Sequence, residues 1–246
     1  MQLADFTIAS NRRIAKDVYR IVLTTAAPLS PPIPGQFANI QLDGFYLRRP
    51  ISVCDWEGQT MVLIYKILGE GTKRLARRQP GESLNLLLWL GNGYTPVKAR
   101  RPVLIGGGVG VPPLYLLAKE LAKAGQRPTA ILGFNSAEDV FCQDEFAEFC
   151  DTVVTTADGS MGQKGFVTAA MEINYDALYT CGPEPMLEAV YRQAKELPVG
   201  HAQFSFERRM GCGFGACMVC SCKTIAGSKR ICMEGPVLTK EEILWQ

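Results

Sequence analysis

The sequence has little of three things: histidine, net charge and long apolar runs. Its 246 residues include one histidine, His201, which nearly removes histidine-based catalysis and histidine-rich metal sites from consideration. The formal net charge is only +2, which argues against a dedicated nucleic-acid-binding protein. The longest apolar runs, residues 86–90 and 109–118, are too short to span a bilayer. We therefore expect neither nucleic acid nor a membrane among its partners.

A signal peptide is also missing, because the first six residues have no basic segment and begin no apolar core. We expect a cytoplasmic protein whose nine cysteines are reduced. Hydrophobic residues make up 47% of the chain and charged residues 20%, so it can bury real cores. Four cysteines stand singly and are expected to be small buried hydrophobic residues: Cys54, Cys142, Cys150 and Cys181.

What the sequence does have is a cysteine-rich stretch near its C-terminus, residues 207–222. Cys212, Cys217 and Cys220 follow the spacing Cys-x4-Cys-x2-Cys, and eleven residues separate Cys220 from Cys232. This is the ligand order of a plant-type [2Fe–2S] site. Glycines at 211, 213 and 215 let backbone N–H groups approach the sulfides and offset their negative charge. Basic side chains nearby are expected to add positive charge: Arg208, Arg209, Lys223 and Arg230.

Two questions stay open at this site. Four cysteines can also hold a structural zinc ion, but zinc sites usually show two Cys-x2-Cys pairs and this chain has one, which favours the iron–sulfur interpretation. The return to Cys232 is short for a plant ferredoxin, and Cys222 is a spare thiol within reach. We interpret Cys222 as a non-ligand, although spacing alone does not exclude it.

The chain before this stretch divides into two parts with different hydrophobic periods. Residues 1–97 contain short β-branched and aromatic runs between Pro, Gly and Asn clusters, which predicts a small antiparallel barrel with one helix at 71–78. From residue 98 strands alternate with helices, which predicts a parallel-sheet domain over 98–198 with helices on both faces. Its expected helices begin after residue 110 and cover 144–149, 166–171 and 183–195. Residues 199–246 would form a small third domain.

Two features of the first part suit phosphate groups. Arg49 precedes the hydroxyl of Ser52 by three residues, and such a pair can bind one phosphate. The segment 69–72 opens the predicted helix, whose free N–H groups also attract anions. Together they suit a dinucleotide such as FAD, although each has an ordinary alternative as solvated arginines or as a helix N-cap.

The second part carries a glycine-rich turn after its first strand, at residues 106–110. It departs from the ordinary NAD fingerprint, because prolines stand where the third glycine would be and no acidic residue ends the next strand. A related nucleotide crevice is still expected at the carboxyl ends of the strands. The candidate NAD contacts are Gly107, Gly108, Gly110, Cys181 and Gly182.

Taken together, these motifs resemble the ferredoxin–NADP reductase superfamily. The resemblance rests on Arg49-Pro-Ile-Ser52, Gly71-Thr72, Gly106–Gly110 and Cys181-Gly-Pro183. The cysteine stretch narrows it to the electron-transfer subunits of type B dihydroorotate dehydrogenases, over essentially the whole chain. The resemblance implies the cluster ligands Cys212, Cys217, Cys220 and Cys232. It also implies FAD contacts at Arg49, Pro50, Ile51, Ser52, Ile64, Tyr65, Lys66, Gly71 and Thr72.

The same resemblance implies a function in pyrimidine (UMP) biosynthesis. The partner would be an FMN-containing catalytic subunit, in a heterotetramer with two copies of each chain. Electrons from dihydroorotate would pass from that FMN through the [2Fe–2S] cluster and FAD to NAD⁺, and this chain would not bind orotate. Two alternatives stay open: a subunit of another NAD(P)H oxidoreductase, of ferredoxin–NADP reductase or sulfhydrogenase type, or a non-enzymatic module with structural zinc and a regulatory nucleotide site.

Overall fold

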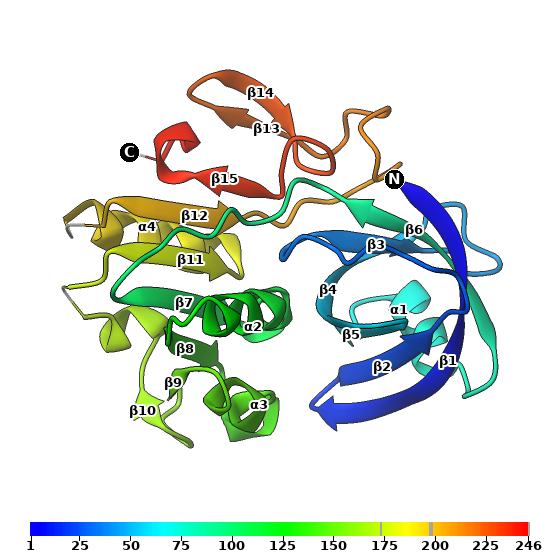
Figure 1. Ribbon diagram of the computed structural model, residues 1–246, viewed down its shortest axis with the longest axis horizontal. Coiled ribbons are helices and arrows are strands. Elements are labelled where there is room, and N and C mark those ends of the chain that lie inside the picture. The colour runs from blue at the N-terminus through cyan, green and yellow to red at the C-terminus, as the bar shows by residue number, and fades with distance from the viewer. Residues whose placement is uncertain (173, 197–198, 246) are drawn as a thin grey trace.

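The computed structural model describes residues 1–172, 174–196 and 199–245. Figure 1 shows a β-barrel beside an α/β sheet, with the cysteine-rich C-terminal segment lying across the top of both. This arrangement confirms the expected fold class: an antiparallel barrel, a parallel-sheet nucleotide-binding domain and a small cysteine-rich part.

The barrel is closed and antiparallel, with the strand order β1-β2-β5-β4-β3-β6. Alternate side chains fill its interior, where Phe6, Ile21, Leu63 and Leu86 are fully buried. Helix α1 (Glu70–Ala76) packs its Leu75 against this core. The strands are β1 (Gln2–Ala15), β2 (Val18–Thr24), β3 (Phe37–Ile40), β4 (Arg49–Glu57), β5 (Thr60–Lys66) and β6 (Ser83–Leu90).

The second sheet has seven strands in the order β10-β9-β8-β7-β11-β12-β15, and all neighbours are parallel except β12 and β15. No helix in the described part of the chain is long and apolar enough to cross a membrane. The strands of this sheet are β7 (Pro102–Gly107), β8 (Thr129–Phe134), β9 (Asp151–Thr156), β10 (Gln163–Lys164), β11 (Ala177–Cys181), β12 (His201–Ser205) and β15 (Val237–Thr239). The helices of the same domain are α2 (Tyr115–Lys123), α3 (Gln143–Ala147) and α4 (Glu184–Glu196).

Several expected elements differ in the structure. The helix expected at 166–171 is a 3₁₀ turn, Val167–Ala170. The buried side chain of Val167 anchors this turn by packing against Gly133. A Cβ added to Gly133 would lie 2.4 Å from the Val167 Cγ1 atom. The helix expected after residue 110 starts only at Tyr115, because two 3₁₀ turns come first, the second opened by Pro112. The remaining shifts are small: α1 ends at Ala76, α3 ends at Ala147 and α4 covers Glu184–Glu196.

The cysteine-rich segment is tied to the nucleotide-binding sheet at both ends. Strand β12 pairs in parallel with β11, and β15 pairs with β12 from the other side. Between them lies a two-stranded ribbon, β13 (Ser221–Thr224) and β14 (Gly227–Arg230). The domain limits 1–97, 98–198 and 199–246 stay predictions, but the sheet runs across the limit at 198. Hydrophobic pattern could not reveal this, because β12 looks like any short strand in the sequence.

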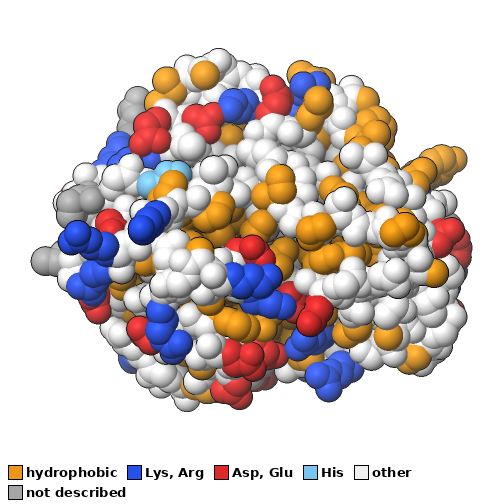
Figure 2. Space-filling model, in the orientation of Figure 1, with side chains coloured by type: hydrophobic (Ala, Val, Ile, Leu, Met, Phe, Trp, Pro, Cys, Tyr) orange, Lys and Arg blue, Asp and Glu red, His pale blue; other side chains and the backbone are white. Residues whose placement is uncertain are grey.

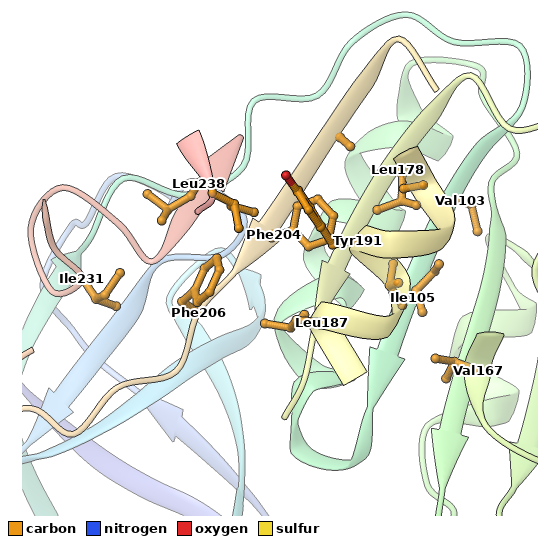
Figure 3. Close-up of a cluster of buried hydrophobic side chains, with 14 of the residues drawn as sticks. Val103, Ile105, Val167, Leu178, Leu187, Tyr191, Phe204, Phe206, Ile231 and Leu238 are labelled. Atoms are coloured by element: carbon orange, nitrogen blue, oxygen red, sulfur yellow. The ribbon is translucent and has the colours of Figure 1, made fainter. Parts of the chain in front are cut away.

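A continuous core joins the three parts. Figure 3 shows Phe206 and Leu238 between Ile231 of the cysteine-rich segment and helix α4, which carries Leu187 and Tyr191. Three barrel residues belong to the same hydrophobic cluster: Phe37, Leu87 and Leu90. On the other face of the sheet, Lys119 of α2 forms an ion pair with Asp55 of the barrel at 2.7 Å.

Tyr94 anchors the connection between barrel and sheet, and its hydroxyl can be tested. The buried hydroxyl donates to the Thr180 carbonyl of β11 at 2.9 Å. Tyr94→Phe should lower the free energy of unfolding by about 0.5–1.5 kcal/mol, the usual net contribution of such a bond. Urea titration measures the change. Tyr46→Phe is the matched control, because Tyr46 is fully exposed. Equal stability of the two variants would contradict this role.

Candidate functional site

A cavity of about 670 Å³ lies where the barrel, the sheet and the cysteine-rich segment meet. Its walls come from β4, β5, the start of α1, the turn after β7 and residues 205–210. The structure brings all nine expected flavin contacts to this one cavity: Arg49, Pro50, Ile51, Ser52, Ile64, Tyr65, Lys66, Gly71 and Thr72.

The two neighbouring arginines at this wall have different roles. Arg48 holds the barrel together, because its guanidinium donates to the side chains of Gln41 at 2.8 Å and Asn85 at 2.7 Å and to two main-chain carbonyls. Arg49 lies over the ring of Phe45, 4.6 Å from its centroid, and donates only to nearby main-chain carbonyls. Arg49 therefore keeps donors for an anion in the cavity, and Arg48 does not.

Gly71 and Thr72 shape the wall beside Arg49. A Cβ on Gly71 would lie 2.1 Å from Arg49 Nε, so only glycine lets the arginine lie against the start of α1. The Thr72 hydroxyl accepts hydrogen bonds from the N–H groups of Leu68 at 3.0 Å and Gly69 at 3.3 Å. These bonds fix the loop before the helix. The wall therefore combines a guanidinium with helix N–H groups, a combination that fits a phosphate.

Tyr65 belongs to the cavity only through its strand. Its ring packs into the barrel, where its hydroxyl donates to Asn11 Oδ1 at 3.0 Å and burial raises its pKa. Alternation along β5 then turns Ile64 and Lys66 to the opposite face. The family resemblance implied all three residues as flavin contacts without distinguishing their directions.

A second cavity, of about 540 Å³, opens at the carboxyl ends of β7, β8, β9 and β11. This is the edge at which open α/β sheets bind nucleotides. Four of the expected NAD contacts line it, Gly107, Gly108, Gly110 and Gly182, whereas Cys181 lines the first cavity. The two cavities adjoin, because four residues line both: Lys66, Val109, Gly110 and Glu207.

Close packing explains why residues 107 and 110 of this turn are glycines, and an open turn explains the glycine at 108. A Cβ on Gly110 would lie 2.3 Å from the Cys181 carbonyl oxygen, and one on Gly107 would lie 2.4 Å from Met186 Sδ. Gly108 has φ +52 and no neighbour within 4 Å of a Cβ, so its backbone faces open space. The glycine-rich turn therefore leaves room for a ligand beside it.

The sequence reasoning missed two groups of wall residues. No acidic residue ends β8, but the 3₁₀ turn that follows brings Asp139 to the second cavity, with Oδ1 4.0 Å from Lys66 Nζ. Residues 205–210, which lead into the cysteines, line the first cavity. The position of residues 205–210 follows from the pairing of Ser205 with Cys181, which exists only once the sheet is formed.

Backbone N–H groups surround the expected cluster thiols. Cys212 Sγ accepts from Ala216 at 3.2 Å and from two further N–H groups, and Cys232 Sγ accepts from Gly215 at 3.1 Å. Burial opposes ionisation of Cys212, but the N–H groups outweigh it and lower the pKa of this thiol to about 6. Gly213 and Gly215 have φ +81 and +89, which lets the loop wrap closely. Burial and the neighbouring Cys220 raise the pKa of Cys232 to about 12, so the backbone favours the thiolate form at Cys212 but not at Cys232.

The thiols fall into two pairs. Cys217 Sγ accepts from the Cys212 N–H at 3.3 Å, and Cys220 Sγ accepts from the Cys232 N–H at 3.4 Å. Two pairs of thiols match a [2Fe–2S] cluster, in which each iron is bound by two protein ligands. Cys222 is half-buried and packs against the hydrophobic cluster, and within the described residues its one hydrogen bond goes to the Lys223 carbonyl at 3.8 Å rather than to another thiol.

The remaining candidates lie outside this constellation. Cys54, Cys142 and Cys150 are buried, as expected, and Cys181 is half-buried at the first cavity. His201 begins β12 and lines neither cavity. Of the nearby cations, Arg208 forms a two-pronged ion pair with Glu184 at 2.7 and 2.8 Å, and Arg230 pairs with Glu234 at 2.9 Å. The positive charges of Arg208 and Arg230 are therefore largely neutralised by these carboxylates.

Comparison with known proteins identifies the two cofactor regions. Residues 104–192 match the family described as the oxidoreductase NAD-binding domain. Residues 207–244 match the iron–sulfur cluster binding domain of dihydroorotate dehydrogenase B. The chain therefore carries an NAD-binding domain and an iron–sulfur domain.

Full-length relatives and solved structures agree. The dihydroorotate dehydrogenase B (NAD(+)) electron transfer subunits of Geobacillus sp. (strain WCH70) and Fusobacterium nucleatum are each 41% identical to this chain, over 99% of both sequences. A chain of an NADH-dependent reduced ferredoxin-NADP oxidoreductase structure superposes with a TM-score of 0.89 at 30% identity, covering 98% of this chain and 90% of its own length. Phthalate dioxygenase reductase, at 18% identity and a TM-score of 0.69 over 91% of this chain and 87% of its own, shares the fold.

The sequence identity and coverage of these matches show to which of the expected families the chain belongs. The curated relatives match along nearly the whole chain, and the cysteine-rich segment matches the iron–sulfur cluster binding domain of dihydroorotate dehydrogenase B. The chain is an oxidoreductase subunit, and it belongs to the family of electron-transfer subunits of dihydroorotate dehydrogenase B.

Proposed function

We propose that this chain takes electrons from the FMN of a dihydroorotate dehydrogenase catalytic subunit and passes them through a [2Fe–2S] cluster and FAD to NAD⁺, in pyrimidine biosynthesis. One observation carries the proposal. The flavin cavity shares four wall residues with the nucleotide cavity on one side, and residues 205–210 lead from it to the thiols on the other. We expect the cytoplasm as the compartment, because none of the nine cysteines forms a disulfide bond.

The flavin cavity fits FAD through the residues of its wall. Arg49 would hold a phosphate with its guanidinium fork, and the N–H groups at the start of α1 would share the charge. When bound, FAD supplies the ability to take electrons singly and to give two together as hydride. Lys66 and Glu207, which line both cavities, would position the flavin against the nicotinamide.

The loop around the thiols would hold the cluster and present it to the partner. Phe214, Met218, Val219 and Met233 are each about half exposed around the cysteines. Figure 2 shows hydrophobic side chains gathered on the same upper right part of the molecule. Exposed apolar patches of this kind mark interaction surfaces. We propose that the catalytic subunit docks on residues 207–222, in a heterotetramer with two copies of each chain.

The ligand set can be tested by single substitutions. Cys232→Ala should lose the cluster, since Cys232 is buried against Cys220 and accepts from Gly215. Cys222→Ala should keep about two irons per chain, because Cys222 has no bond to the other thiols. Iron content and the visible spectrum of anaerobically purified protein give the answer. Loss of iron in Cys222→Ala together with retention in Cys232→Ala would show that the fourth ligand is wrong.

The flavin site can be tested at Arg49. Arg49→Ala should weaken FAD binding about ten- to a hundred-fold, because a hydrogen bond to a charged group contributes about 1.5–3 kcal/mol. Gly71→Ala should act in the same direction, since its Cβ would displace the guanidinium. Arg12→Ala removes an exposed arginine of β1 and serves as the control. FAD retention after dialysis is measured; retention equal to the control would remove Arg49 from the site.

The division of labour gives a third test. The isolated chain should oxidise NADH with an artificial acceptor and should form no orotate, because its one histidine lines neither cavity and both cavities are accounted for by nucleotides. Orotate should appear only when the FMN-containing subunit is added. Orotate formation by the isolated chain would refute the proposal. So would a complex in which residues 207–222 face solvent, far from every partner flavin.

A second candidate function follows from the structural neighbour at 30% identity. An NADH-dependent ferredoxin-NADP oxidoreductase subunit has the same fold over 90% of its length. The same reconstitution separates the two, because that function requires ferredoxin and NADP rather than dihydroorotate as reaction partners.

A further inference from the structure

A third cavity lies on the outer face of α1 and is lined almost entirely by cations. It encloses about 330 Å³, within the size range of small-molecule sites. Its lining carries four positive charges against the single negative charge of Glu70: Lys73, Arg74, Arg77 and Arg78, with the ring of Phe45 at one side. Nothing in the electron relay uses this cavity.

The helix itself gathers the charges. Glu70, Lys73, Arg74 and Arg77 stand at positions i, i+3, i+4 and i+7 and share one face. Like charges at this spacing repel and destabilise a helix. The helix dipole compensates one or two cations in the last turn, but it does not explain why a loop folds a hollow over them. That loop, residues 43–45, turns through Gly44 at φ +79, and a Cβ there would lie 3.9 Å from Arg74 Nη1.

The cations differ in how far they are neutralised. Lys73 pairs with Glu70 at 2.7 Å, and Arg78 pairs with Asp43 at 2.9 Å and Glu82 at 3.2 Å. Arg78 Nε is nonetheless buried without an acceptor. Within the described chain, the guanidinium groups of Arg74 and Arg77 have neither an ion pair nor a hydrogen bond. Two uncommitted forks beside an unsatisfied buried donor are the arrangement that binds phosphate oxygens.

We propose that this basic pocket, lined by residues 45, 70, 73, 74, 77 and 78, binds a small molecule that carries two or more phosphate charges. The site adjoins the flavin cavity without being part of it. Glu70 lines both, and Phe45 carries Arg49 on its ring at 4.6 Å. The pocket is half open to solvent, and its volume of about 330 Å³ suits a small anion better than an acidic peptide.

The test uses the FAD-loaded chain and two probes, inorganic pyrophosphate and a nucleoside triphosphate. Titration calorimetry should find one saturable site per chain whose affinity falls as salt is added. Arg74→Gln/Arg77→Gln should weaken binding at least about tenfold, since it removes both free forks. Tighter binding of the nucleoside triphosphate would show that the base contributes, and equal binding would show a site for phosphate alone.

The matched control is Lys98→Gln/Arg100→Gln, which removes the same charge from an exposed loop elsewhere. It should bind both probes like the parent chain, and thermal unfolding should show that both double variants fold. Three results would overturn the proposal: no saturable binding, equal weakening in the control, or binding only to the chain stripped of FAD. The last would assign the pocket to the flavin site.

Discussion

The parallel pairing of β12 with β11 determines where the thiols lie relative to the two cavities. Its register places Ser205 beside Cys181, so the chain leaves the sheet at the edge where both cavities open. Residues 206–210 line the flavin cavity, and one further residue leads to Cys212. Because β15 then pairs with β12, the cysteine-rich segment is held at both ends by one sheet.

The barrel closes this arrangement from the other side. Asn39 donates to the Cys212 carbonyl at 3.3 Å, and Asn92 donates to the Val237 carbonyl at 2.7 Å. Barrel side chains also share a hydrophobic cluster with α4 and with Ile231 of the cysteine-rich segment. The flavin cavity is thus bounded by three parts that cannot move independently without exposing apolar surface. Such rigidity suits electron transfer, which depends on fixed separations between cofactors.

The backbone supplies direct hydrogen bonds to the thiols. The sequence suggested that four basic side chains would supply positive charge, and two of them, Arg208 and Arg230, are paired with Glu184 and Glu234. The N–H groups that the glycine-rich loop turns inward donate to the sulfurs themselves. Fixed backbone dipoles need no counter-ion rearrangement when the charge of a bound group changes. Arg230 assists by donating to the Gly215 carbonyl at 2.9 Å, which holds this loop in place.

The sequence by itself determined the class of each part and the chemistry at its site. Cysteine spacing, the glycine turn and the Arg49–Ser52 motif are local, because each depends on residues a few positions apart. Only the tertiary structure decided which of these motifs share a cavity and which way their side chains point. Arg48 and Arg49 both line the flavin cavity, yet Arg48 is bonded to barrel side chains whereas Arg49 donates only to neighbouring main-chain carbonyls among the described residues. Likewise residues 205–210 reach the flavin cavity through the pairing of β12 with β11, two segments whose contact no local pattern encodes.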